Sequence, residues 1–224
     1  MQSKGSRMED EIAWPRPGMS LLKTTNERDW RPNANMTWGP NWTLYQYGYA
    51  EAAKLLMRRT ASGRDQDFLI YPILFTARQA IELGLKEIIL AGSRLMGRGE
   101  PDLISHDLGH LWELAKILLA DAEALHHPGA SDEAATTAFE DLIKQLSAAD
   151  PKSMTFRYPV DTKGRPSFVV GASDGKVPEL INTRDLSNTL DAMFNYLTGA
   201  GAWLENILET VDGLDADFRA DQEW

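Results

Sequence analysis

Three charged side chains, Arg78, Glu82 and Lys86, recur at four-residue intervals within the apolar segment 71–90. Residues four apart lie next to one another on the surface of a helix, so this spacing can hold an ion pair or a ligand. A charge buried in so apolar a helix needs a partner, because an unpaired buried charge is very unfavourable. Arg78 and Glu82 can satisfy each other, whereas Lys86 needs a further acid or an anionic ligand. The alternative is a solvated ion-pair ladder at the edge of the helix.

A second polar cluster, SHDLGHLWELA at residues 105–115, opens another segment with apolar periodicity. His106 and His110 are four apart and can share a metal ion, with Asp107 as a third ligand. The spacing falls short of a metalloenzyme motif, and the alternative is that Asp107 stabilises the start of a helix while His106 packs beside it. We therefore regard Asp107 and His110 as candidate ligand contacts and expect no bound metal or cofactor.

Arg157 stands between Phe156 and Tyr158 in the segment TFRYP, residues 155–159. A guanidinium flanked by aromatic rings can stack on a base or clamp a phosphate, and it can equally pair with a helix carboxylate. The sequence contains no P-loop, no dinucleotide fingerprint, no G-x-S-x-G elbow and no H-E-x-x-H motif. This argues against a common metabolic enzyme.

The formal net charge is −10, and residues 205–224 hold seven acids against one base. A protein that coats phosphate backbones is normally basic, so this charge argues against nonspecific DNA binding while leaving room for a small RNA or nucleotide site. The chain has no cysteine, which excludes disulfides, thiol nucleophiles and thiolate zinc sites. With no apolar leader and no run of about 20 apolar residues, we expect a cytoplasmic protein without membrane contact.

The elements that must position these residues form an all-α fold, predicted as an up-and-down bundle of about five helices. The expected helices cover residues 41–60, 67–93, 105–125, 132–149 (with Ser131 as N-cap) and 183–211. The alternating segment 154–170, centred on Lys163 and Gly164, predicts a short β-hairpin.

Three parts are expected along the chain: an extended arm at 1–40, a helical domain at 41–212 and a frayed acidic tail at 213–224. The arm contains Trp14, Trp30 and Trp38, and tryptophans are unfavourable in water. We expect the arm to dock, either on its own domain or on a second subunit.

The segments LFTARQAIELGLKEIIL and SHDLGHLWELA resemble the HEPN superfamily of prokaryotic helical domains, whose members often combine R-x-x-x-E-x-x-x-K and HDL-x-x-L helices. The resemblance covers about residues 68–120, and the helix order loosely to 210. It implies a bundle that commonly dimerises and acts in defence, toxin–antitoxin or abortive-infection systems. In active members it implies metal-independent RNA cleavage by an R-x(4–6)-H motif. This chain departs from that motif, because seven residues separate Arg98 from His106.

Two functions follow as expectations. The first is a HEPN-like module that acts on or binds RNA or nucleotides; as an enzyme it would be a metal-independent ribonuclease. Arginine would stabilise phosphate charge and histidine would move a proton. Its site would combine Arg78, His106 and Arg157, with Glu82 orienting Arg78, and ligand contacts from Lys86, Asp107, His110 and Tyr158.

The second is a non-catalytic dimeric protein-interaction module in which the charged stripe is structural, with a cognate protein as a further partner. An open cleft shared by Arg78, His106 and Arg157 would favour the first function, and a closed salt-bridge network would favour the second.

We also expect a homodimer, in which the helix at 67–93 or the tryptophan arm crosses to the partner. The motive is that this helix is too apolar for one face of a bundle. The alternative is a monomer whose arm folds back over its own bundle.

Overall fold

The computed structural model describes residues 14–22, 34–36, 39, 41–61, 63–129, 132–171 and 177–222. The chain divides into two units, Met1–Gly39 and Pro40–Trp224. Of the three tryptophans in the arm, Trp14 is described and is exposed, whereas Trp30 and Trp38 lie outside the described residues. The docking of the arm therefore stays a prediction.

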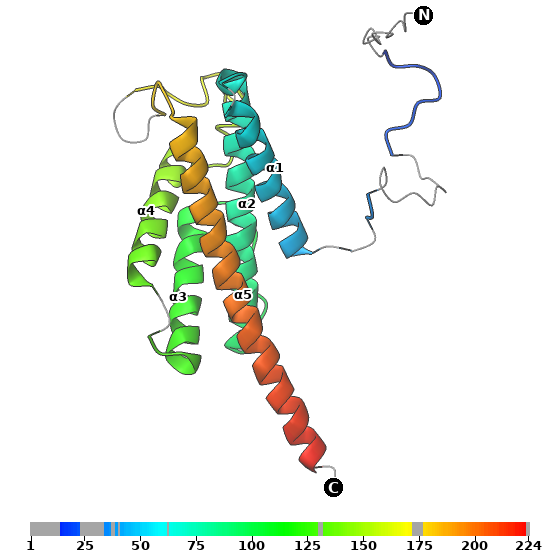
Figure 1. The fold of residues 1–224 in the computed structure, drawn as a ribbon, viewed down its shortest axis with the longest axis vertical. Coiled ribbons are helices and arrows are strands. Elements are labelled where there is room, and N and C mark those ends of the chain that lie inside the picture. Colours follow the sequence, from blue (N-terminus) through cyan, green and yellow to red (C-terminus); the bar gives the residue numbers. More distant parts are fainter. Residues whose placement is uncertain are drawn as a thin grey trace, which may run out of the picture. The chain divides into compact units, whose positions relative to one another are not determined.

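The second unit is a helical bundle, which confirms the predicted all-α class (Figure 1). Its helices are α1 (Trp42–Thr60), α2 (Gln66–Leu95), α3 (Leu108–His126), α4 (Glu133–Ala149) and α5 (Thr183–Gln222). The N-cap of α4 is Asp132 rather than Ser131, since the Asp132 side chain accepts a hydrogen bond from the amide of Ala135. Helix α5 continues well past the expected end near 211, so residues 213–222 are helical rather than frayed.

The direction of the helices does not alternate throughout, because α2 and α3 run the same way. Two contacts establish this: His106, just before α3, touches Arg78, and Leu118, later in α3, packs against Gly92, later in α2. The connection 96–107 therefore returns along α2 before α3 begins (Figure 1). That return path carries His106 to the charged stripe.

The predicted hairpin at 154–170 is wrong as a strand pair, although its turn is in the expected place. Gly164 has a φ of +74°, and its amide bonds the carbonyl of Asp161 at 3.0 Å. The flanking residues make one isolated antiparallel bridge, between Val160 and Pro166. Pro159 and Pro166 have no backbone N–H to donate, which limits any longer ladder.

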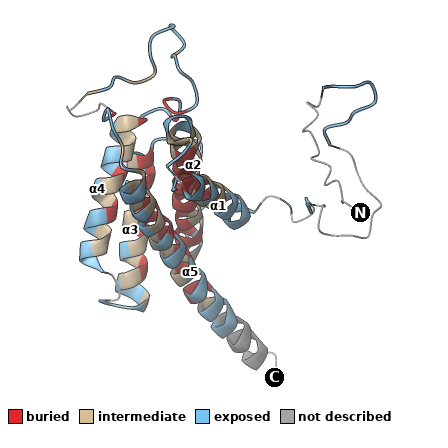
Figure 2. Ribbon diagram, turned by 45° about the horizontal axis from the view of Figure 1, so that its top comes forward, coloured by how far each residue is buried: buried red, intermediate tan, exposed pale blue. Residues whose placement is uncertain are grey.

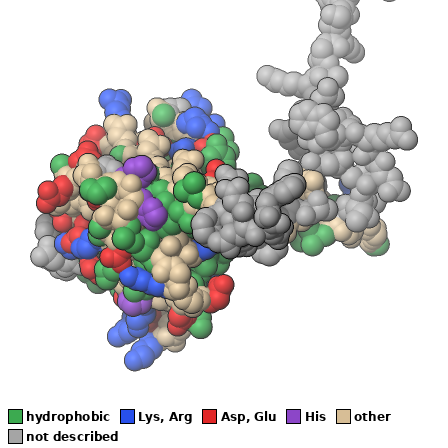
Figure 3. Space-filling view, turned by 90° about the horizontal axis from the view of Figure 1, so that it is seen from below, with side chains coloured by type: hydrophobic (Ala, Val, Ile, Leu, Met, Phe, Trp, Pro, Cys, Tyr) green, Lys and Arg blue, Asp and Glu red, His purple; other side chains and the backbone are tan. Residues whose placement is uncertain are grey.

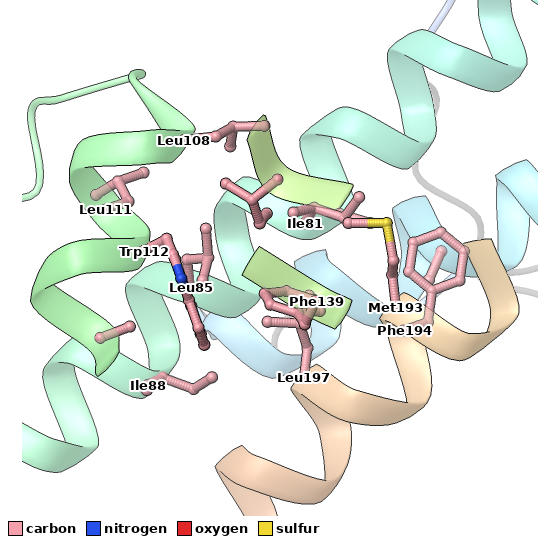
Figure 4. Packing of buried hydrophobic residues seen from close by; sticks show 14 of the residues in the cluster. Ile81, Leu85, Ile88, Leu108, Leu111, Trp112, Phe139, Met193, Phe194 and Leu197 are labelled. Atoms are coloured by element: carbon pink, nitrogen blue, oxygen red, sulfur yellow. The ribbon is translucent and has the colours of Figure 1, made fainter. Parts of the chain in front are cut away.

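Helix α2 is the central element of the bundle, packed by α1, α3 and α5. Buried residues line the inner faces of these helices (Figure 2). Trp112 of α3 and Phe139 of α4 meet edge to face at 4.9 Å, and they lie among Leu85 of α2 and Leu197 of α5 (Figure 4). Neighbouring helices of the same chain thus account for the apolar character of α2.

Among the residues that the structure describes, α2 is also the one helix long and apolar enough to cross a membrane. The core helix of a globular bundle meets the same description, and α2 carries three buried charged side chains in its central turns: Arg78, Glu82 and Lys86.

Close approach of α2 and α3 at Gly92 gives a first prediction. A Cβ at Gly92 would lie 2.8 Å from the Cβ of Leu118, whereas a Cβ at Gly213 in α5 would meet nothing within 4 Å. Alanine at Gly92 should lower the free energy of unfolding by about 1–2 kcal/mol, since overpacking exceeds the gain of about 1 kcal/mol in helix propensity. Gly213→Ala, the matched control, should raise it slightly. Urea unfolding of both variants measures the difference, and equal stabilisation would contradict the close approach.

Candidate functional site

Arg78 is the centre of a buried charge network, which we define as Arg78, Glu82, Lys86, His106, Asp150 and Ser153. Its side chain is 1% exposed. The Nη1 atom donates to Glu82 Oε2 at 3.0 Å and to Ser153 Oγ at 2.8 Å. Nη2 donates to the backbone oxygen of His106 at 2.7 Å, and Nε lies 3.1 Å from Asp150 Oδ2. All three guanidinium nitrogens therefore have partners within the chain.

Glu82 joins the charged stripe to the exposed histidine. Its Oε1 accepts a hydrogen bond from Lys86 Nζ at 2.9 Å and lies 2.8 Å from His106 Nδ1. Glu82 and Lys86 are buried, but the His106 side chain is 67% exposed. When Nδ1 carries the proton and donates to Glu82, Nε2 is the ring nitrogen left for solvent or a ligand. The network thus orients an imidazole at its edge.

Two members of the network, Asp150 and Ser153, were missed by sequence reasoning. Asp150 ends α4, and its Oδ1 accepts hydrogen bonds from the amides of Met154 and Thr155, which folds the chain back under Arg78. Ser153 has a φ of +58°, an unfavourable backbone region for serine that persists only where the surroundings fix it. No spacing in the sequence signals these contacts, because they join residues 72 and 75 positions apart.

Two opposing effects set the pKa of Glu82, and the combined effect of the neighbouring cations is the larger. Burial would raise the pKa of this carboxyl, but hydrogen bonds from Lys86 and His106 and the charges of both hold it below its ordinary value of 4.5. A group whose pKa is lowered in the folded state stabilises that state above its unfolded pKa, and the stabilisation is lost as the pH falls through the folded pKa.

This gives a pH prediction. The difference in unfolding free energy between wild type and Glu82→Gln should shrink as the pH is lowered below about 5, because the carboxylate of wild type is then protonated. Urea unfolding from pH 3 to 7 measures it, with Glu100→Gln in the exposed loop after α2 as the control for loss of a surface charge. A difference that grows as the pH falls would contradict the assigned sign.

The other residues of the SHDLGHL segment do not meet at a metal site. Asp107 is the N-cap of α3, and its Oδ1 accepts a hydrogen bond from the amide of His110 at 3.1 Å. The His110 side chain is exposed. Within the described ranges, no group of three or more His, Asp or Glu side chains is arranged to hold a metal ion. Asp107 therefore has the structural role of a helix cap.

Arg157 lies outside the network. Its guanidinium stacks 5.4 Å from the ring of Phe75 and 5.5 Å from that of Tyr158, while Phe156 is buried. The aromatic partner from α2, Phe75, was not anticipated. A cavity of about 480 Å³ adjoins Arg157 and Tyr158.

His106 and Arg157 both contact side chains of α2, but they do not meet at one site with Arg78. Arg157 stacks on Phe75, and His106 contacts Glu82. Phe75 and Glu82 are seven residues apart, which is about 10 Å along the axis of α2. Arg78 lies between them and is buried. A phosphate could reach His106 or Arg157 from solvent, but it could not contact the enclosed Arg78 without breaking the network.

The chain matches no family model, no curated protein and no solved structure. The resemblance to HEPN domains therefore stays a prediction, and a function for this helical bundle has to be argued from its own residues.

Proposed function

We propose that this chain is a non-catalytic interaction module that works as a homodimer, with the buried charge network as a structural clasp. The observation that carries the proposal is the enclosure of Arg78, whose three nitrogens bond α2, the entry to α3 and the exit of α4. A guanidinium used in this way fixes three chain segments together. The side chain is 1% exposed and its three nitrogens all bond within the chain, so it is poorly placed to stabilise charge that develops in a transition state.

Surface charge supports a partner other than nucleic acid. The chain has a net charge of −10. On the face drawn in Figure 3, basic side chains stand apart among acidic and hydrophobic ones and form no continuous basic surface. Nucleic-acid affinity depends chiefly on clustered Lys and Arg, so this face is poorly suited to a phosphate backbone.

The outer face of α1 supports self-association. Leu44, Tyr47 and Leu55 are about half or more exposed, and helical spacing places Leu44 and Leu55 opposite the buried Ala53. Exposed apolar groups of this kind favour protein contacts. Helix α2, by contrast, is packed within its own chain, so its apolar character gives no reason for it to cross to a partner.

Light scattering at micromolar concentration tests the dimer. The expected mass is twice the 25.0 kDa of the chain. Leu55→Lys should shift the protein toward the monomer, because a charge is unfavourable in a desolvated contact. Leu125→Lys, which changes a leucine of α3 that is also mostly exposed, should leave the mass unchanged. A wild-type mass of one chain would contradict the proposal.

The Glu82–His106 pair favours a second candidate function, an RNA- or nucleotide-directed module. An exposed imidazole held by a buried carboxylate is an arrangement suited to proton transfer. Here Arg78 would act only by holding Glu82, and Arg157, stacked on aromatic rings, would contact a base or phosphate.

An RNA assay separates the two functions. Wild type and His106→Ala are purified in parallel and incubated with a labelled RNA pool and with nucleotides. Alanine keeps the backbone oxygen that Arg78 uses, and the exposed ring contributes little packing, so folding should be retained. If the chain is an interaction module, neither protein should cleave the RNA or bind RNA or nucleotides. Cleavage by wild type that His106→Ala abolishes at unchanged Tm would establish the second function instead.

A further inference from the structure

A cavity of about 630 Å³ opens between α3, α4 and α5, away from the charge network. None of the six network residues lines it. Its volume falls within the range of about 300–1,000 Å³ that is usual for small-molecule sites. Gly199 on α5 contributes part of the wall, and a Cβ there would meet nothing within 4 Å, so the cavity extends to the backbone of α5.

Aromatic rings form one side of this cavity. Trp112, Tyr196 and Trp203 all line it; Trp112 is 1% exposed and Tyr196 stacks on Phe139 at 4.4 Å, so the partly exposed Tyr196 and Trp203 offer the ring surface that a ligand can reach. The Tyr196 hydroxyl lies 3.1 Å from Thr136 Oγ1 across the α4–α5 boundary, which fixes that ring. The faces of such rings attract a cation placed over them.

The charged groups around the cavity are mostly acidic. Four carboxylates line it, from Glu123, Asp132, Glu133 and Glu140, against the single ammonium of Lys116. Lys116 is committed to Glu140, at 2.7 Å. Hydrogen bonds from Lys116 and then Lys144 and Trp112 hold the pKa of Glu140 at about 2, so this carboxylate stays ionised. Because Glu140 is itself paired with Lys116 and Lys144, the excess negative charge comes from Glu123, Asp132 and Glu133. These carboxylates would repel an anionic ligand and attract a cation.

We propose that this cavity binds a small organic cation, an ammonium carried on a flat apolar body. The apolar body would pack against the aromatic rings. The ammonium would lie toward the carboxylates on α3 and α4. The proposal does not depend on the interaction function, because the two rest on different residues.

Three naphthalene probes of similar size and different charge test the charge preference on the full chain by isothermal titration calorimetry: 2-naphthylmethylammonium, 2-naphthalenemethanol and 2-naphthoate. The ammonium should bind about tenfold more tightly than the neutral alcohol, and the carboxylate should bind more weakly than either. Equal affinity for the ammonium and the alcohol, or no binding of the ammonium, would overturn the proposal.

A pair of glycine-to-leucine variants on the same helix tests the location. Gly199→Leu places a side chain in the cavity, whereas Gly213→Leu places one on the exposed part of α5 with nothing within 4 Å. Both substitutions favour helix formation, so both proteins should fold, and circular dichroism checks this. The ammonium probe should lose at least about tenfold in affinity with Gly199→Leu and bind Gly213→Leu as it binds wild type. Unchanged binding by a folded Gly199→Leu would place the probe elsewhere and overturn the assignment; should that variant not fold, the probe series on wild type still decides the charge preference.

Discussion

Replacement of Arg78 by methionine is expected to lower the free energy of unfolding by about 3–5 kcal/mol, because it leaves the buried carboxylate of Asp150 without its cation and takes one of two cations from Glu82. Glu82 and Asp150 are each 1% exposed and both pair with Arg78. Methionine keeps a stem like the aliphatic part of the arginine side chain and removes the guanidinium, so the loss reports chiefly the charge and its hydrogen bonds. Urea denaturation followed by circular dichroism gives the value.

The matched control is Arg157→Met, since the guanidinium of Arg157 stacks on rings at the surface and makes no buried ion pair. Its effect should stay below about 1 kcal/mol. A second variant, Arg78→Met with Asp150→Asn, should recover part of the loss, because the ion pair of Asp150 is with Arg78, whereas Glu82 keeps Lys86. If Arg78→Met costs no more than the control, the network is not a clasp and the interaction module loses its main support.

The second large effect is expected at Trp112, the largest of the fully buried side chains. Alanine at this position should lower the free energy of unfolding by about 3–5 kcal/mol, through lost burial and the cavity that remains. The indole touches Phe139 of α4 and Tyr196 of α5, at ring distances of 4.9 and 6.0 Å, so its loss separates three helices. Thermal and urea unfolding measure the change.

Trp112→Phe separates packing from hydrogen bonding. It keeps an aromatic ring against Phe139 but removes the indole N–H, which lies 3.4 Å from Glu140 Oε2. Its cost should be well under half that of alanine, because that distance is long for a hydrogen bond and Glu140 keeps Lys116 and Lys144. Equal losses for phenylalanine and alanine would mean that the polar contact, and not the packing, stabilises this part of the core.

The helices were predictable because their signals are local. Apolar residues at helical spacing, with an end at Gly or Pro, place α1 to α4 within a few residues of their observed bounds. The hairpin was predicted wrongly because an alternating pattern says which side chains share a face, but not whether the backbone can form a ladder. Pro159 and Pro166 have no backbone N–H, and the segment forms one isolated antiparallel bridge in place of a ladder. The acidic end of α5 shows the reverse case, since a frayed acidic tail was predicted where the helix continues to Gln222.

The sequence by itself determined the charged stripe, because a four-residue interval within a helix makes neighbours of Arg78, Glu82 and Lys86 whatever the rest of the chain does. Only the tertiary structure decided what the stripe can do. The return path of residues 96–107 brought His106 to Glu82, and the cap at Asp150 closed the chain under Arg78. These contacts join distant segments, and they form because a buried guanidinium needs hydrogen-bond partners and a counter-charge once the bundle excludes water. The same exclusion of water that holds the network together also hides Arg78 from any ligand.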